Sequence, residues 1–174
     1  LDVKAFYELC EQVIKYRHIT LAEQCLQVRY LKALDAKELN ELLALAIRYS
    51  ESGRVSLIEK LISAGVDIEF ADENGLTALM LAAQNGHFAI LERLLSCGAN
   101  PNKLDRYEHK YTALHLSVGS SHLPETLLLT MHFDFYQLWP TVGQLYQFWP
   151  NEQMLMQLLT SEASETSWVD ANVT

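Results

Sequence analysis

Residues 72–87 read DENGLTALMLAAQNGH, and this stretch decides the fold. Threonine is a preferred helix N-cap, and apolar residues follow Thr77, so we predict a helix that starts directly after it. The small side chains of Ala82 and Ala83 would let a neighbouring helix approach closely. Gly86 then ends the predicted helix and turns the chain.

A second helix is predicted after this turn, because apolar residues again recur every three or four positions. These positions are Phe88, Ile90, Leu91, Leu94 and Leu95. Gly98 ends the helix as a left-handed C-terminal cap. The unit is therefore a helix pair followed by an extended loop, and one such pair cannot bury its apolar faces alone.

The same unit recurs along the chain with a period of 33 residues. Residues 56–65 read SLIEKLISAG and residues 89–98 read AILERLLSCG, so charged, apolar and glycine positions align. The same offset joins Asp72 to Asp105. A repeat of this length indicates stacked helix pairs that bury a joint core.

The stretch 72–87 resembles the core of an ankyrin repeat, and residues 98–102, GANPN, resemble that family's G-A-D-x-N ending. The period is also the one that ankyrin repeats have. The resemblance covers residues 39–131 and implies an all-α helical solenoid, with helical flanks that do not carry ankyrin residues.

Three repeats are expected within the resemblance. In chain order they are a degenerate copy at 39–71, a near-consensus copy at 72–104 and an irregular copy at 105–131. In the first copy the offset of the leading helix is 36 residues, which we interpret as an extra helical turn before Gly53. In the third copy the loop has two inserted residues, and Lys110 stands where Gly75 would be, so we expect a loop of different shape.

In the ankyrin family, a threonine and a histidine of the T-P-L-H tetrapeptide share hydrogen bonds that fix the loop. Thr112 and His115 match these positions, so the resemblance implies the same bonds in the third repeat. Met80 replaces the histidine beside Thr77, so the bond is expected to be absent from the middle repeat.

The N-terminal flank, residues 1–38, reads as helices and is interpreted as a cap or as the end of a preceding domain. Thr20 with Glu23 forms a possible capping box for a helix over residues 21–34. Asp35 with Glu38 forms another, for the helix that follows.

The C-terminal flank, residues 132–174, contains YQLWP at 136–140 and YQFWP at 146–150. We interpret this doubled motif as a hydrophobic cap over the last repeat, since an uncapped end would expose the core. The alternative is a partner-binding surface, because aromatic residues concentrate in hot spots. Residues 161–174 are acidic and serine-rich, and we expect them to be frayed.

The resemblance also implies a binding surface, because ankyrin proteins bind partners through loop tips and exposed inner-helix residues on a concave face. Carried onto this chain, the partner-binding positions are Glu73, Asn74, Leu76, Gln84, Asn85, Tyr107, His109 and Tyr111. Tyrosine and histidine together on one loop suit protein recognition. The alternative is that these are solvated loop residues.

Composition limits the classes of partner and the compartment. A net charge of −9 disfavours nucleic acid and suits a basic or partly apolar protein partner. No stretch is long and apolar enough to predict a membrane span. Cys10, Cys25 and Cys97 do not form a disulfide framework, which favours the cytoplasm.

No catalytic, cofactor or metal site is predicted. His18, His109 and His132 lack metal-ligand spacing, and His87 and His122 match a structural position of the family. Cys97 is predicted at the C-terminal end of a helix, where the helix dipole disfavours a thiolate nucleophile.

The function we expect is a monomeric, non-enzymatic protein–protein interaction module. One alternative is an accessory ankyrin domain of a larger enzyme, or of a secreted bacterial effector that acts in the host cytoplasm, whose active site lies outside this chain. The first residue, Leu1, is not an initiator methionine, which favours this alternative. A third hypothesis is oligomerisation through the tryptophan-rich end.

Overall fold

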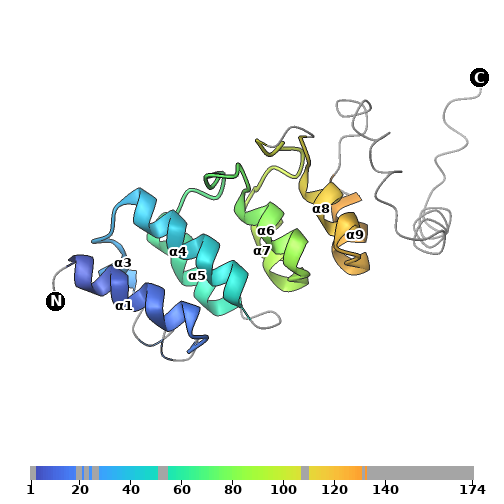
Figure 1. The fold of residues 1–174 in the computed structure, drawn as a ribbon. Helices are drawn as coiled ribbons and strands as arrows, with labels where there is room; N and C mark the ends of the chain where they lie inside the picture. The colour runs from blue at the N-terminus through green and yellow to red at the C-terminus, as the bar shows by residue number, and fades with distance from the viewer. Residues whose placement is uncertain are drawn as a thin grey trace, which may run out of the picture.

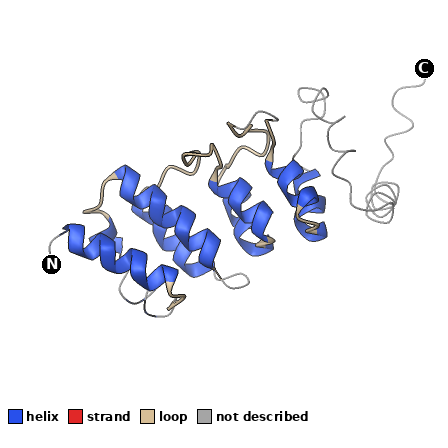
Figure 2. Ribbon diagram, viewed as in Figure 1, coloured by secondary structure: helices blue, strands red, loops and turns tan. Residues whose placement is uncertain are grey.

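The computed structural model describes residues 3–18, 21, 24, 28–50, 55–106, 110–130 and 132. Within these residues all the regular structure is helical, and one isolated β-bridge joins Ala71 to Thr77 (Figure 2). The predicted all-α class is confirmed.

The helices form two rows that run along the molecule (Figure 1). The inner row consists of α1 (Val3–Lys15), α4 (Ala36–Tyr49), α6 (Ala78–Asn85) and α8 (Ala113–Gly119). The outer row consists of α3 (Val28–Leu31), α5 (Val55–Ala64), α7 (Phe88–Ser96) and α9 (Leu123–Thr130). Each helix packs against the next in its row, and from α4 onward inner and outer helices also pack in pairs. This arrangement is a helical solenoid, as predicted.

Helix ends lie where the capping residues predict them. Asp35 caps α4: its Oδ1 accepts the Glu38 backbone N–H at 2.7 Å, and Glu38 Oε2 accepts the Asp35 N–H at 3.0 Å. Thr77 caps α6, and Gly86 ends it in a left-handed conformation. The other capping box, Thr20 with Glu23, lies outside the described residues, and the helix predicted as far as residue 34 ends with α3 at Leu31.

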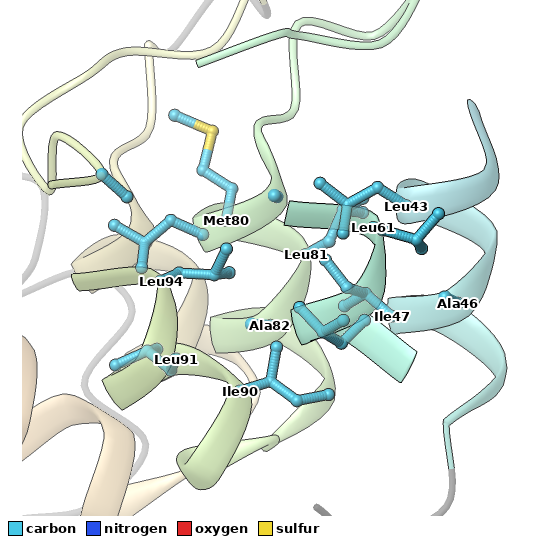
Figure 3. Packing of buried hydrophobic residues seen from close by; sticks show 14 of the residues in the cluster. Leu43, Ala46, Ile47, Leu61, Met80, Leu81, Ala82, Ile90, Leu91 and Leu94 are labelled. Atoms are coloured by element: carbon cyan, nitrogen blue, oxygen red, sulfur yellow. The ribbon is translucent and has the colours of Figure 1, made fainter. Parts of the chain in front are cut away.

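The core lies between the two rows and includes side chains from each of the described helices. Figure 3 shows the part where α4, α5, α6 and α7 meet. Its fully buried members include Ile47, Leu61, Leu81, Ala82, Ile90, Leu91 and Leu94. Burying one such leucine or isoleucine contributes about 1.5–3 kcal/mol. Ala82 and Ala83 are completely buried, in line with the predicted close packing of α6 between α4 and α8. Phe88 departs from the predicted apolar stripe and is 40% exposed.

The first repeat accommodates its additional residues differently from the prediction. α4 ends at Tyr49, and Ser50 is extended, with φ −63° and ψ 129°. The three additional residues therefore follow the helix and separate it from α5, which starts at Val55. The prediction that α4 gains a helical turn before Gly53 is wrong, because the helix ends at Tyr49. Gly53 itself lies outside the described residues. At its other end α4 starts at Ala36, directly after the predicted Asp35 cap, and it has 14 residues against 8 in α6.

The N-terminal flank continues both rows, because α1 packs against α4 and α3 packs against α5. The predicted boundary between residues 38 and 39 falls inside α4. In the C-terminal flank, residues 133–174, which include the doubled YQxWP motif, lie outside the described residues.

Candidate protein-interaction surface

Two loops lie along one edge of the array, each directly before an inner-row helix (Figure 1). We call residues 67–76 the first finger, and the described residues 100–106 with 110–111 the second finger. Asp72 determines the shape of the first finger: its Oδ1 accepts the backbone N–H groups of Asn74 and Leu76, each at 2.9 Å. Its own N–H donates to the Leu76 carbonyl at 3.0 Å. The finger is therefore a closed, internally bonded turn.

The base of the second finger repeats this closure. The Asp105 N–H donates to the Tyr111 carbonyl at 2.9 Å, and the Tyr111 N–H donates to Asp105 Oδ1 at 3.0 Å. Lys110 has φ +51° and Gly75 has φ +79°, so both are left-handed. The second closure spans six positions and the first spans four, in line with the two inserted residues. The predicted difference in loop shape falls on residues 107–109, which lie outside the described residues.

The two fingers stack against each other. A Cβ atom on Gly75 would lie 2.4 Å from the backbone nitrogen of Arg106, so only glycine allows this approach. At their bases, Glu69 Oε1 accepts the Asn100 N–H at 2.8 Å, and Lys103 Nζ lies 3.2 Å from Glu69 Oε2. The fingers thus form one continuous edge.

The predicted threonine–histidine bond is present in the third repeat. The Thr112 N–H donates to His115 Nδ1 at 3.2 Å, and Thr112 Oγ1 lies 2.8 Å from the same nitrogen. In the middle repeat, Met80 partly replaces the histidine: the Thr77 N–H lies 3.5 Å from Met80 Sδ, and Thr77 Oγ1 accepts the Met80 N–H at 3.3 Å. A weaker sulfur contact therefore stands where we expected no bond.

The predicted partner-binding residues fall into distinct places. Glu73 and Asn74 are exposed at the tip of the first finger, and Gln84 and Asn85 are exposed at the far end of α6. The 8-residue α6 separates these two pairs by about 12 Å, so they are not one patch. Leu76 is only 7% exposed, and its side chain belongs to the core rather than to the surface.

The remaining candidates are at positions 107, 109 and 111. Tyr111 is half-buried, and its ring packs against His115 with centroids 5.6 Å apart. Tyr107 and His109 lie outside the described residues.

A groove of about 320 Å³ lies between the first finger, α1 and α4, and sequence reasoning missed it. Its α4 side consists of Lys37, Glu41, Ala44, Leu45 and Arg48. These positions recur at three- and four-residue spacing, which places them on one face of the helix. This spacing can be recognised in the sequence, although it does not reveal which other elements lie opposite these residues.

Burial affects how readily the His87 imidazole takes up a proton. The ankyrin pattern gives this residue a structural role. Desolvation by burial lowers the pKa of its imidazole, while a hydrogen bond to the Ile47 backbone and the charge of Glu125 raise it less. Cys10 is buried and Cys97 is half-buried at the end of α7, whereas Cys25 lies outside the described residues.

Over the part of the chain that the structure describes, no three histidine, cysteine, aspartate or glutamate side chains are grouped as metal ligands would be. The same part contains no helix with the length and apolar character that crossing a membrane requires.

Comparison with known proteins identifies the repeat. A family model described as "Ankyrin repeats (3 copies)" matches residues 43–135. This match spans more than half of the chain, and the chain belongs to the ankyrin-repeat family. Proteins of this family generally act as protein–protein interaction modules and are typically non-catalytic.

Individual relatives match the same region. The chain is similar to a putative ankyrin repeat protein of Rickettsia felis, 36% identical over 62 residues, which cover 36% of this chain and 94% of the relative. It is 31% identical over 108 residues to "Ankyrin repeat and KH domain-containing protein mask-1" of Caenorhabditis elegans, covering 60% of this chain and 4% of the relative. It is 33% identical over 94 residues to a rat liver glutaminase, covering 53% of this chain and 15% of the enzyme.

Proposed function

We propose that this chain binds a protein partner through a concave surface formed by the fingers and the inner-row helices. The observation that carries the proposal is the first finger, which presents Glu73 and Asn74 to solvent on a turn that Asp72 holds closed. Side chains exposed on an internally bonded loop can contact a partner, since they take no part in packing the core.

Binding by such a surface depends on rigidity. The finger is hydrogen-bonded within itself, joined to α4 by the Arg48–Asp72 ion pair and packed against the second finger at Gly75. Little conformational freedom is therefore lost when a partner docks, and the entropic cost of association falls. The acidic chain favours a basic or partly apolar partner. The module acts as a monomer in the cytoplasm, without cofactor or metal.

The test is affinity capture from lysate followed by mass spectrometry. The bait is the full chain, compared with a Glu73→Ala/Asn74→Ala variant and with a Tyr107→Ala/His109→Ala/Tyr111→Ala variant, after circular dichroism has shown that each is folded. Glu92→Ala, an exposed change on outer-row α7, is the control. We expect the control to retain a partner that a finger variant loses. A partner retained equally by every variant would contradict this surface.

A second candidate function is an accessory module of a larger protein, possessing no active site of its own. The comparison with the rat glutaminase favours this candidate, because the chain matches only 15% of that enzyme. The bacterial relative motivates the corresponding effector hypothesis, in which the module acts in host cytoplasm. Deleting these repeats from the full-length protein is the test: altered activity or targeting supports this candidate, and unchanged activity and targeting contradict it.

A further inference from the structure

The groove between α1, α4 and the first finger has an apolar floor and a charged rim. We propose that it binds an extended segment of the partner in which an apolar side chain lies next to a lysine or arginine. This inference rests on the proposed function and specifies the chemistry of the partner.

The floor of the groove accepts an apolar side chain. Ala44, Leu45 and Phe70 line it, and all three are half-buried, so that each still exposes apolar surface. The volume of about 320 Å³ lies at the small end of ligand pockets, which hold roughly 300–1,000 Å³. It therefore suits one or two side chains of an extended segment better than the face of a folded helix.

The rim is negatively charged. Four carboxylate side chains line the groove against two basic ones, Lys37 and Arg48. Arg48 is engaged at 2.8 Å by Asp72, whereas Lys37 is 77% exposed and lies 3.7 Å from Glu41. Among the described residues, Glu73 has no hydrogen-bond or ion-pair partner, and it is exposed at the finger tip. The fourth carboxylate, Glu11, is paired with Lys15 at 2.6 Å, so Glu41 and Glu73 are the ones available to a cation from outside.

Tyr7 of α1 orients one of these carboxylates. Its hydroxyl donates to Glu41 Oε2 at 2.7 Å. Burial and the Glu41 hydrogen bond raise the pKa of this phenol, so the hydroxyl keeps its proton and remains a donor. Glu41 Oε1 stays directed towards the solvent-exposed Lys37, where a cation from the partner can compete. The tyrosine ring also lines the groove, and aromatic faces attract lysine and arginine.

The same charges exclude other classes of occupant. An acidic or phosphorylated segment would place negative charge beside Glu41 and Glu73, and like-charge juxtaposition is unfavourable at an interface. A wholly apolar segment would fill the floor and leave the rim carboxylates unused. A basic residue beside an apolar one satisfies both parts of the groove.

The experiment selects phage-displayed random peptides on the immobilised full chain and measures the enriched peptides by fluorescence anisotropy. We expect enriched sequences to carry lysine or arginine next to an apolar residue. Glu41→Gln and Glu73→Gln should each weaken binding roughly two- to fivefold, as expected for an exposed ion pair. Leu45→Gln should weaken it further, and Glu92→Gln on α7 should leave it unchanged, although it removes the same charge.

Three outcomes overturn the inference. Enriched peptides that lack the basic residue, or whose binding does not change in Glu41→Gln and Glu73→Gln, place the binding chemistry elsewhere. Recovery of no enriched peptide overturns it as well, because a groove of this kind should bind short segments. The proposed function is judged separately by the lysate capture, so a partner lost in a finger variant keeps that function even when the peptide inference fails.

Discussion

The guanidinium of Arg48 on α4 lies 2.8 Å from the Asp72 carboxylate at the base of the first finger. Arg48 donates to Oδ2, while Oδ1 accepts the backbone N–H groups of Asn74 and Leu76. One carboxylate therefore shapes the finger and joins it to the preceding repeat. The repeats are connected along the finger edge as well as through the core.

Replacing Asp72 should weaken the finger more than breaking its ion pair does. Asp72→Ala removes two backbone hydrogen bonds to the carboxylate together with the Arg48 ion pair, and should lower the free energy of unfolding by about 2 kcal/mol. Asp72→Asn keeps an acceptor oxygen and should cost about 1 kcal/mol or less. Urea denaturation measures both, and hydrogen exchange should show faster exchange of the Asn74 and Leu76 amides in Asp72→Ala. Arg48→Ala breaks only the ion pair. If it lowered the free energy of unfolding as much as Asp72→Ala and Asp72→Asn do, the ion pair alone would stabilise the finger.

The two left-handed glycines Gly75 and Gly98 should respond differently to alanine. Gly98 has φ +89° with no atom within 4 Å of the added Cβ, so Gly98→Ala should cost only the backbone strain, about 1–2 kcal/mol. At Gly75 the Cβ would also collide with Arg106, so Gly75→Ala should cost at least about 1 kcal/mol more. Chemical denaturation of both variants checks the order, and a smaller loss for Gly75→Ala would refute the stacked fingers.

Removing the threonine hydroxyl should matter more in the third repeat than in the middle one. Thr112→Val removes a 2.8 Å bond to the buried His115 and should cost about 1–2 kcal/mol. Thr77→Val removes a 3.3 Å bond from the Met80 N–H and should cost about 0.5–1 kcal/mol. Thermal and urea unfolding provide the comparison, in which the reverse order would contradict the assigned bonds.

Stability should fall as the solution becomes acidic, because burial lowers the pKa of His87 below its usual value of 6.5. Below that value the unfolded chain binds a proton that the folded chain does not, so protonation favours unfolding. The loss should begin as the pH falls through 6.5 and level off below the lowered pKa. His122 and Glu125 also act on this ring.

Denaturation at several pH values measures this slope. His87→Gln should flatten it, because it removes the group that takes up the proton on unfolding. A slope that persists in His87→Gln would assign the acid sensitivity to another group.

Much of the repeat could be predicted from sequence, since its signals are local. A cap such as Asp35 acts on residues within one turn, and Gly86 and Gly98 end helices through their own backbone angles. The apolar spacing places Leu91 and Leu94 in the core for the same reason.

The surface was harder to predict, because it depends on contacts between distant residues. Tyr7 and Glu41 are 34 positions apart, and only the packing of α1 on α4 brings them to one groove. Leu76 occupies a loop position that the family pattern assigns to recognition, yet its side chain turns into the core between the finger and the helices. Lys110 keeps the left-handed backbone of Gly75, although its residue type does not favour that conformation.

Because the helices pack against their neighbours along two rows, the effect of a destabilising substitution depends on its position in the rows. The pair α6 with α7 packs against α4 with α5 on one side and against α8 with α9 on the other. In such linear arrays each unit draws its stability from its immediate neighbours. A destabilising substitution in α6 or α7 therefore separates α1, α3, α4 and α5 from α8 and α9, whereas one in α8 or α9 affects only that end of the rows.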